Sequence, residues 1–159
     1  MRILIVSDTH RKNDNYFRIL KKQGKLDMII HCGDIEGSEY ALSESADCPV
    51  FMISGNNDFF SELPRDRELN VGNYKVWVTH GHYYGVSLGI EMLKQEARSR
   101  GVQVVMFGHT HRPCIDIEDD LVAINPGSLS YPRQEGHKPS YALMEIDRHG
   151  EAHYTIGYL

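Results

Sequence analysis

The chain has 159 residues, of which 41% are hydrophobic and 25% are charged, and its formal net charge is −5. This composition is that of a globular protein and excludes a collagen, a coiled coil and a disordered chain. The excess of acidic over basic residues argues against a protein that binds nucleic acid mainly through a basic face.

Strand and helix patterns alternate in the first part of the chain. Short apolar runs predict strands at residues 2–6, 28–31 and 50–53. Apolar residues at helical spacing predict helices at residues 13–23 and 36–46. The order strand, helix, strand, helix, strand favours parallel strands that are joined by right-handed crossovers.

The rest of the chain contains mixed elements and then only strands. A hairpin, a helix, a strand and two further hairpins are expected at residues 69–79, 88–100, 102–107, 115–124 and 141–158. A length of 159 residues favours one domain. We therefore expect a single α/β domain over residues 1–159, with helices on the outer faces of its sheets.

The N-terminal apolar run, RILIV at residues 2–6, is followed almost at once by Asp8. A secretory signal needs a longer apolar stretch, and no run approaches the roughly 18 residues of a membrane span. The three cysteines have no paired spacing, which is typical of free thiols. These features predict a cytoplasmic protein with no membrane partner.

Side chains that can bind metal ions follow five of the predicted strands. They are Asp8, His10, Asp34, Asn56, His80, His82, His109 and His111. In open α/β sheets, functional sites lie beyond the carboxyl ends of the strands. Carboxylate, amide and imidazole ligands together suit Mn, Fe, Zn, Ni or Co. One zinc ion needs about four ligands, whereas about seven of these residues would hold two metal ions. Centres with two metal ions catalyse displacement at phosphorus.

The same positions form a series of short motifs. The motifs are D-T-H at 8–10, G-D at 33–34, G-N-N-D at 55–58, H-G-H at 80–82 and G-H-T-H at 108–111. Their order and spacing resemble those of the calcineurin-like metallophosphoesterase superfamily. The short length and the N-P-G-S sequence at 125–128 resemble its small bacterial and archaeal phosphodiesterase subfamily.

The resemblance implies a fold and a metal centre. The fold is an αββα sandwich of two packed mixed sheets with helices on the outer faces. The first implied metal ion is bound by Asp8, His10, Asp34 and His111. The second is bound by Asp34, Asn56, His80 and His109. Asp34 would bridge two divalent transition metal ions, with manganese expected and Ni, Fe, Zn or Co as alternatives, and a hydroxide between them would be the nucleophile.

Two positions depart from the family pattern. Asn57 stands where the family has a catalytic histidine, and an asparagine can donate a hydrogen bond to a phosphoryl oxygen but cannot act as a general acid. His82 is the nearest alternative proton donor, although local packing would also account for it. Arg11 stands where the family usually has glycine, and it would either contact the substrate phosphate or remain in solvent.

The resulting hypothesis is a metal-dependent phosphoester hydrolase that acts on a small substrate. Asn57 favours phosphodiesters, because monoesters with alkoxide leaving groups benefit most from a general acid. One alternative is a non-catalytic scaffold, since the retromer scaffold subunit has this fold. Another is a nuclease acting on short oligonucleotides, although the net charge favours no strong binding of nucleic acid. The sequence also allows the protein to form a homo-oligomer.

Overall fold

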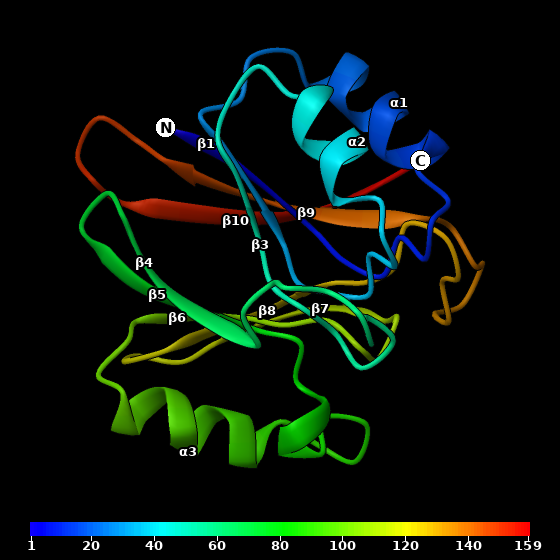
Figure 1. Ribbon diagram of the computed structural model, residues 1–159. Helices are drawn as coiled ribbons and strands as arrows, with labels where there is room; N and C mark the ends of the chain where they lie inside the picture. The colour runs from blue at the N-terminus through cyan, green and yellow to red at the C-terminus, as the bar shows by residue number, and fades with distance from the viewer.

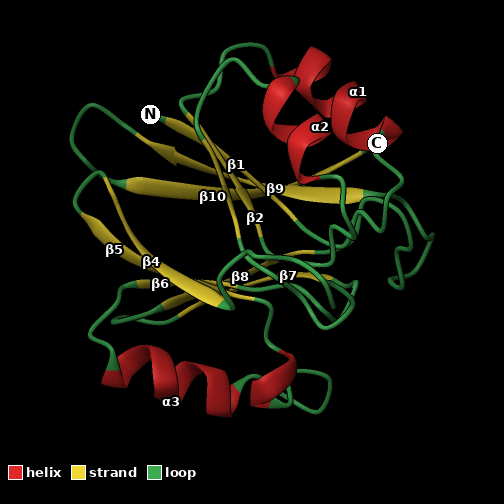
Figure 2. Ribbon diagram, in the orientation of Figure 1, coloured by secondary structure: helices red, strands yellow, loops and turns green.

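Two five-stranded sheets pack face to face in the computed structural model, which describes residues 1–159 (Figure 1). Helices cover the two outer faces, so that the layers follow the order helix, sheet, sheet, helix (Figure 2). The expected αββα sandwich is therefore confirmed. None of the helices has the length and apolar character needed to cross a membrane.

The first sheet has the strand order β10-β9-β1-β2-β3. Its strands are β1 (Arg2–Val6), β2 (Met28–His31), β3 (Val50–Met52), β9 (Ser140–Ile146) and β10 (Ala152–Tyr158). Strands β1, β2 and β3 are parallel, whereas β9 runs antiparallel to both β1 and β10. Because Val6 pairs with His31 and His31 pairs with Met52, the loops after the three parallel strands leave from one edge of the sheet.

The second sheet has the order β4-β5-β6-β8-β7. Its strands are β4 (Asp66–Val71), β5 (Tyr74–Thr79), β6 (Val104–Met106), β7 (Pro113–Ile117) and β8 (Val122–Pro126). Strands β5, β6 and β8 are parallel, with Val78 in register with Met106 and Met106 with Ile124. The three loops that follow these strands again leave from one edge.

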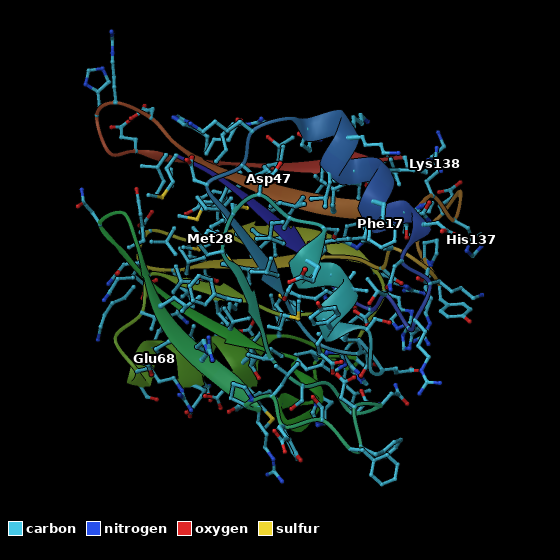
Figure 3. The ribbon with its side chains drawn as sticks, turned by 45° about the horizontal axis from the view of Figure 1, so that its top comes forward. Phe17, Met28, Asp47, Glu68, His137 and Lys138 are labelled. Carbon is cyan, nitrogen blue, oxygen red and sulfur yellow. The ribbon has the colours of Figure 1, made fainter.

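The apolar strands are buried on both of their faces, which explains their continuous hydrophobic runs. Ile3 and Ile5 of β1 face the space between the sheets. Leu4 and Val6 face the other way, toward α1 (Asp14–Gln23) and α2 (Glu39–Glu44). Phe17 of α1 is partly buried against this second cluster (Figure 3).

The outer face of the second sheet is covered by a single α-helix, α3 (Glu91–Ser99). Leu93 and Ala97 of α3 are fully buried against Trp77 of β5 and Val105 of β6. Lys94 is buried beside them, and its ammonium group donates hydrogen bonds to carboxylates that include Asp116. The helix therefore stabilises the sheet by apolar packing along one face.

We expect Leu93→Ala to lower the free energy of unfolding by about 2–5 kcal/mol, because it leaves a cavity between α3 and the sheet. Met92→Ala, on the adjacent residue, is the matched control, since Met92 is 62% exposed. Its effect should stay within about 0.5 kcal/mol. Urea unfolding followed by circular dichroism measures both values. Equal losses in the two variants would contradict the packing of α3 described above.

Two of the three helix predictions were too long. The helix expected at 36–46 spans only Glu39–Glu44, because Glu36 and Gly37 have positive φ angles and cannot continue a helix. The helix expected at 88–100 begins at Glu91, after Gly89 with a φ angle of 153°. A 3-10 turn, η1 (His82–Tyr84), precedes it and contains His82, which the sequence singled out.

Candidate metal centre

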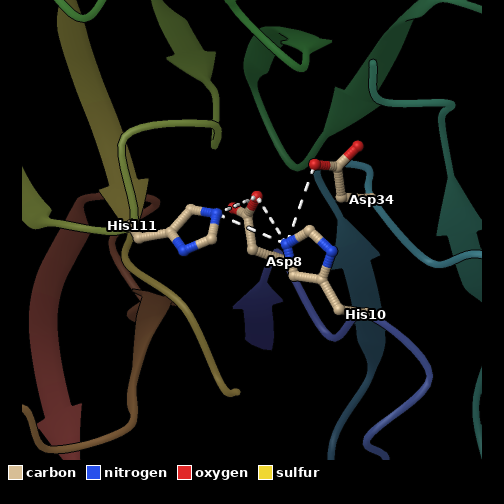
Figure 4. Close-up of side chains that lie close together, drawn as sticks. All are labelled: Asp8, His10, Asp34 and His111. Atoms are coloured by element: carbon tan, nitrogen blue, oxygen red, sulfur yellow. Dashed lines mark hydrogen bonds and ion pairs between the residues drawn. The ribbon is translucent and has the colours of Figure 1, made fainter. Parts of the chain in front are cut away.

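The first predicted set of metal ligands comes together where the loops after β1, β2 and β6 meet. Ligand atoms of Asp8, His10, Asp34 and His111 all lie within 4.8 Å of one another (Figure 4). His111 Nε2 lies 3.1 Å from Asp8 Oδ1 and 3.4 Å from His10 Nε2. His10 Nε2 lies 3.8 Å from Asp34 Oδ2. These four side chains form a compact group of oxygen and nitrogen donors.

The second predicted set lies next to the first. Asn56 Oδ1 is 3.0 Å from His80 Nε2 and 2.9 Å from His109 Nδ1. His80 Nε2 is in turn 3.4 Å from Asp34 Oδ2, the oxygen that also faces His10. Asp34 is therefore the side chain that the two groups share, and all seven predicted ligands lie in one cluster.

The backbone of the ligand loops is strained. Asp8, His10, Asp34, His109 and His111 all have φ angles between 44° and 68°. Non-glycine residues rarely adopt this left-handed conformation, and such strain persists only where the surrounding structure imposes it. Glycines allow the loops to approach closely, since a Cβ atom on Gly55 would overlap Asp34 and one on Gly108 would overlap Ser7. The loops therefore have no room for a side chain at Gly55 and Gly108, which explains why glycine occupies these two motif positions.

The Nδ1 atoms of three histidines are already engaged by hydrogen bonds. His10 donates to Glu36 Oε1 at 2.6 Å, His80 to the carbonyl oxygen of Cys32 at 2.7 Å, and His111 to that of Tyr131 at 2.8 Å. An imidazole that donates from Nδ1 presents the lone pair of Nε2. This arrangement, which is typical of metal-binding histidines, aims three Nε2 atoms at the two carboxylates.

The close contact between Asp8 and His111 requires a positive charge between the two side chains. Asp8 Oδ1 is buried and accepts no hydrogen bond, and the Nε2 lone pair of His111 faces it at 3.1 Å. Two lone pairs at this distance repel one another unless a proton or a metal ion lies between them. Buried carboxylates and imidazoles that converge in this way fit a divalent transition metal.

The charges of the cluster are strongly coupled. Burial alone would raise the pKa of Asp8, but the close approach of His111 and the charge of His80 hold it below its ordinary value. Burial likewise opposes a charge on His80, yet Asp34 and Asp8 raise the pKa of His80 to about 9. A metal ion must displace such a proton, so acid weakens metal binding.

Asp58 holds the loops after β2 and β3 together. Its buried carboxylate accepts hydrogen bonds from the backbone N–H groups of Asp34, Ile35, Glu36 and Gly55, at distances of 2.6–3.0 Å. Charge-assisted bonds of this kind are about twice as strong as neutral ones. Asp58 is the fourth residue of the G-N-N-D motif. The motif alone did not indicate its role, which is to anchor these two loops.

The N-P-G-S sequence at 125–128 anchors two further ligand loops. Ser128 Oγ donates a hydrogen bond to the carbonyl oxygen of Asp8 at 2.8 Å. Asn125 Nδ2 donates to the carbonyl oxygen of Gly108 at 2.8 Å. Both side chains are fully buried. This segment is therefore the end of strand β8 and the start of the loop after it, and it fixes the backbone on either side of the centre.

The two residues proposed for catalysis lie at the edge of the cluster. Asn57 donates from its backbone N–H to Asp34 Oδ1 at 2.8 Å and from its side chain to Asp34 Oδ2 at 2.7 Å. His82 packs against His80 and His109, with ring centroids 5.4 Å and 6.0 Å away. Burial and the neighbouring histidines lower the pKa of His82 to about 4. Of these two residues, Asn57 therefore orients the carboxylate of Asp34 directly, whereas His82 contacts neighbouring histidine rings.

Glu36 is a contact of the centre that sequence reasoning missed, because no motif contains it. We expect Glu36→Ala to weaken binding of Mn²⁺ by about 10- to 100-fold, since His10 loses the group that orients its ring. Glu39→Ala is the matched control, because Glu39 contacts Ser61 rather than a predicted ligand. Titration calorimetry on the metal-free protein measures both affinities. An unchanged affinity in Glu36→Ala would contradict the assignment of His10 as a ligand.

Comparison with known proteins identifies the family. The profile of the calcineurin-like phosphoesterase superfamily domain matches residues 1–149. A probable metallophosphoesterase of Bacillus subtilis is 32% identical over 92% of this chain and 85% of its own length. One of Methanocaldococcus jannaschii is 36% identical over 84% of this chain and 70% of its own length. A crystal structure of a predicted phosphoesterase from Streptococcus pneumoniae has a TM-score of 0.80 and 26% identity, covering 99% and 97% of the two chains.

Two further relatives differ in what their names state. A protein of M. jannaschii named as a phosphodiesterase is 28% identical over 80% of this chain and 83% of its own length. Vacuolar protein sorting-associated protein 29 of Schizosaccharomyces pombe is 26% identical over 92% of this chain and 85% of its own length. Together with the fold and the cluster of donors, the profile match shows that the chain belongs to the calcineurin-like phosphoesterase superfamily.

Proposed function

We propose that the protein is a phosphodiesterase that binds two divalent metal ions. Asp8, His10, Asp34 and His111 would hold one ion, and Asp34, Asn56, His80 and His109 the other. The observation that carries the proposal is the position of Asp34 Oδ2, which lies 3.8 Å from His10 Nε2 and 3.4 Å from His80 Nε2. A carboxylate suits a bridge because its charge and two oxygens can be shared.

Bound metal ions would polarise the phosphoryl oxygens and lower the pKa of water toward 7. The residues of this chain supply the geometry for that chemistry. The Nδ1 contacts of His10, His80 and His111 fix the rings, and the two hydrogen bonds from Asn57 fix Asp34. Manganese is the ion that we propose among Mn, Fe, Zn, Ni and Co, all of which suit a donor set of carboxylates, an amide oxygen and imidazoles.

The preference for diesters rests on Asn57. Its amide cannot supply the proton that an alkoxide leaving group requires, and its side chain is directed to Asp34. His82 is the remaining imidazole beside the cluster. Because its pKa is lowered to about 4, it is neutral near pH 7, and we propose that it assists the leaving oxygen by donating a hydrogen bond rather than a proton. A small phosphoester is the proposed substrate.

Hydrolysis of bis(p-nitrophenyl) phosphate by protein freed of metal with a chelator tests the proposal. We expect no activity without metal, activity after addition of Mn²⁺, and two equivalents of bound metal by elemental analysis. Activity that persists without metal would contradict the proposal. A fully metal-loaded protein without activity would favour the scaffold alternative that the sandwich fold also permits.

A further inference from the structure

A cavity of about 690 Å³ opens beside the metal centre. Three of the residues that line it contact predicted ligands. Glu36 accepts the hydrogen bond from His10, Asn57 donates to Asp34, and Asp58 accepts from the backbone N–H of Asp34. Its volume is in the range of sites for small molecules. A substrate whose phosphate lies at the centre would therefore extend its ester group into this cavity.

Two phenylalanines, Phe59 and Phe60, also line the cavity. Phe59 is 79% exposed, and Phe60 is fully exposed. They are the two middle residues of a turn that the N–H of Ser61 closes by donating to the carbonyl oxygen of Asp58 at 3.2 Å. Turns of this kind normally carry Gly, Asn, Asp, Pro or Ser, and neither turn geometry nor burial accounts for two phenylalanines.

The turn is held firmly to the metal centre. Its first residue, Asp58, is the carboxylate that accepts hydrogen bonds from the backbone of Asp34 and its neighbours. The backbone that carries both phenylalanines is therefore fixed relative to Asp34 by the same contacts that shape the ligand loops. This is the arrangement expected of a surface that positions a substrate.

Other exposed aromatic rings also lie at the centre. The Tyr131 ring is 5.3 Å from the His10 ring and has the Lys12 ammonium 4.3 Å from its centroid. The Tyr83 ring is 4.0 Å from the His82 ring and has the Arg65 guanidinium 5.5 Å from its centroid. Exposed rings accompanied by cations are the means by which proteins bind bases and phosphates of single nucleotides or strands.

The charges of the cavity limit what its occupant can be. Four of its lining residues are acidic and only Arg11 is basic; the acidic residues are Glu36, Glu39, Asp58 and Glu62. A second phosphate in the cavity would meet this negative charge, whereas a neutral planar ring would not. Ring amino groups can also donate hydrogen bonds to carboxylates.

We propose that this cavity is the subsite for an aromatic ester group of nucleoside type, which stacks on Phe59 and Phe60. The inference rests on the proposed phosphodiesterase function and names its substrate class. Simple alkyl phosphodiesters would bind only through the phosphate. A nucleoside ester would add stacking, and stacking of one base on an aromatic side chain corresponds to an effect of about 5- to 150-fold.

The test compares two competitive inhibitors of bis(p-nitrophenyl) phosphate hydrolysis by the Mn²⁺-loaded full chain. Adenosine 5′-monophosphate and methyl phosphate share the phosphate group, so the ratio of their inhibition constants isolates the nucleoside. We expect Phe59→Ala and Phe60→Ala to lower the preference for the nucleotide by about 5- to 150-fold in total. Tyr158→Ala, which removes an exposed aromatic ring from β10, should leave the ratio unchanged.

A second measurement does not depend on hydrolysis. Phe60→Trp places a fluorescent ring on the turn, while the native Trp77 is fully buried as an internal background. Adenosine 5′-monophosphate should quench the new fluorescence, and methyl phosphate should not. Quenching in a protein without phosphodiesterase activity would support the subsite and contradict the proposed function. No quenching and an unchanged inhibition ratio in an active enzyme would overturn the subsite alone.

Discussion

Asp34→Asn is expected to lower kcat/KM for bis(p-nitrophenyl) phosphate by at least about 10³-fold. Loss of one preorganised electrostatic group costs about 10²–10³-fold. Asp34 should exceed this range because both groups of donors share its Oδ2 atom. The variant places an amide, which has N–H donors and no charge, where the proposed centre of two metal ions needs a bridging anion.

Steady-state kinetics in saturating Mn²⁺ measure this effect, and elemental analysis measures the bound metal. The matched control is Asp119→Asn, which neutralises an exposed carboxylate in the turn between β7 and β8. It should retain full activity and two metal ions. Asn57→Ala should lose less activity than Asp34→Asn, because Asn57 contributes hydrogen bonds and no shared charge. The reverse order in folded, metal-saturated proteins would show that the role of Asp34 is wrongly assigned.

Asn57→His is expected to raise kcat/KM for phosphomonoesters with poorly leaving alcohols by up to about 10²–10⁴-fold, the usual contribution of a general acid. The family pattern has histidine at this position. Diesters with good leaving groups should change little, since their departure needs little protonation. The backbone N–H of residue 57 still donates to Asp34 Oδ1, so one of the two contacts to the shared carboxylate is kept.

The measurement is the slope of kcat/KM against the pKa of the leaving group, for a monoester and a diester series. Asn57→Ala is the control, because it removes the same side-chain bond to Asp34 without adding an imidazole. A shallower monoester slope in Asn57→His alone would support the role of Asn57 in substrate preference. An unchanged slope in a fully metal-loaded protein would show that Asn57 does not set the preference for diesters.

The main elements of the fold could be predicted because their signals are local. Strand β1 is a run of apolar residues buried on both faces, and its predicted bounds, Arg2–Val6, match the structure. Helix bounds were predicted less well, since tertiary contacts decide them. Asp34 and Glu36 have positive φ angles and donate their N–H groups to Asp58, and α2 can begin only after this loop.

The candidate metal ligands could be predicted from the sequence alone. Parallel strands place their carboxyl ends at one edge of a sheet, so residues that follow strands of the same sheet converge. The ligands come from both sheets, and the face-to-face packing of the sheets brings the two groups together. The motifs around Asp8, Asp34 and His109 therefore carried the metal-centre hypothesis. The sequence also determined the two-sided burial of the central strands through their unbroken apolar runs.

Only the tertiary structure decided the contacts that give these ligands their geometry. Glu36 reaches His10 from another loop, and Ser128 reaches Asp8 from 120 residues away. The insertion of β9 beside β1, and the turn that presents Phe59 and Phe60 at the cavity, are likewise set by long-range pairing and anchoring. Such contacts leave no periodic pattern, because they join single residues whose spacing along the chain is arbitrary.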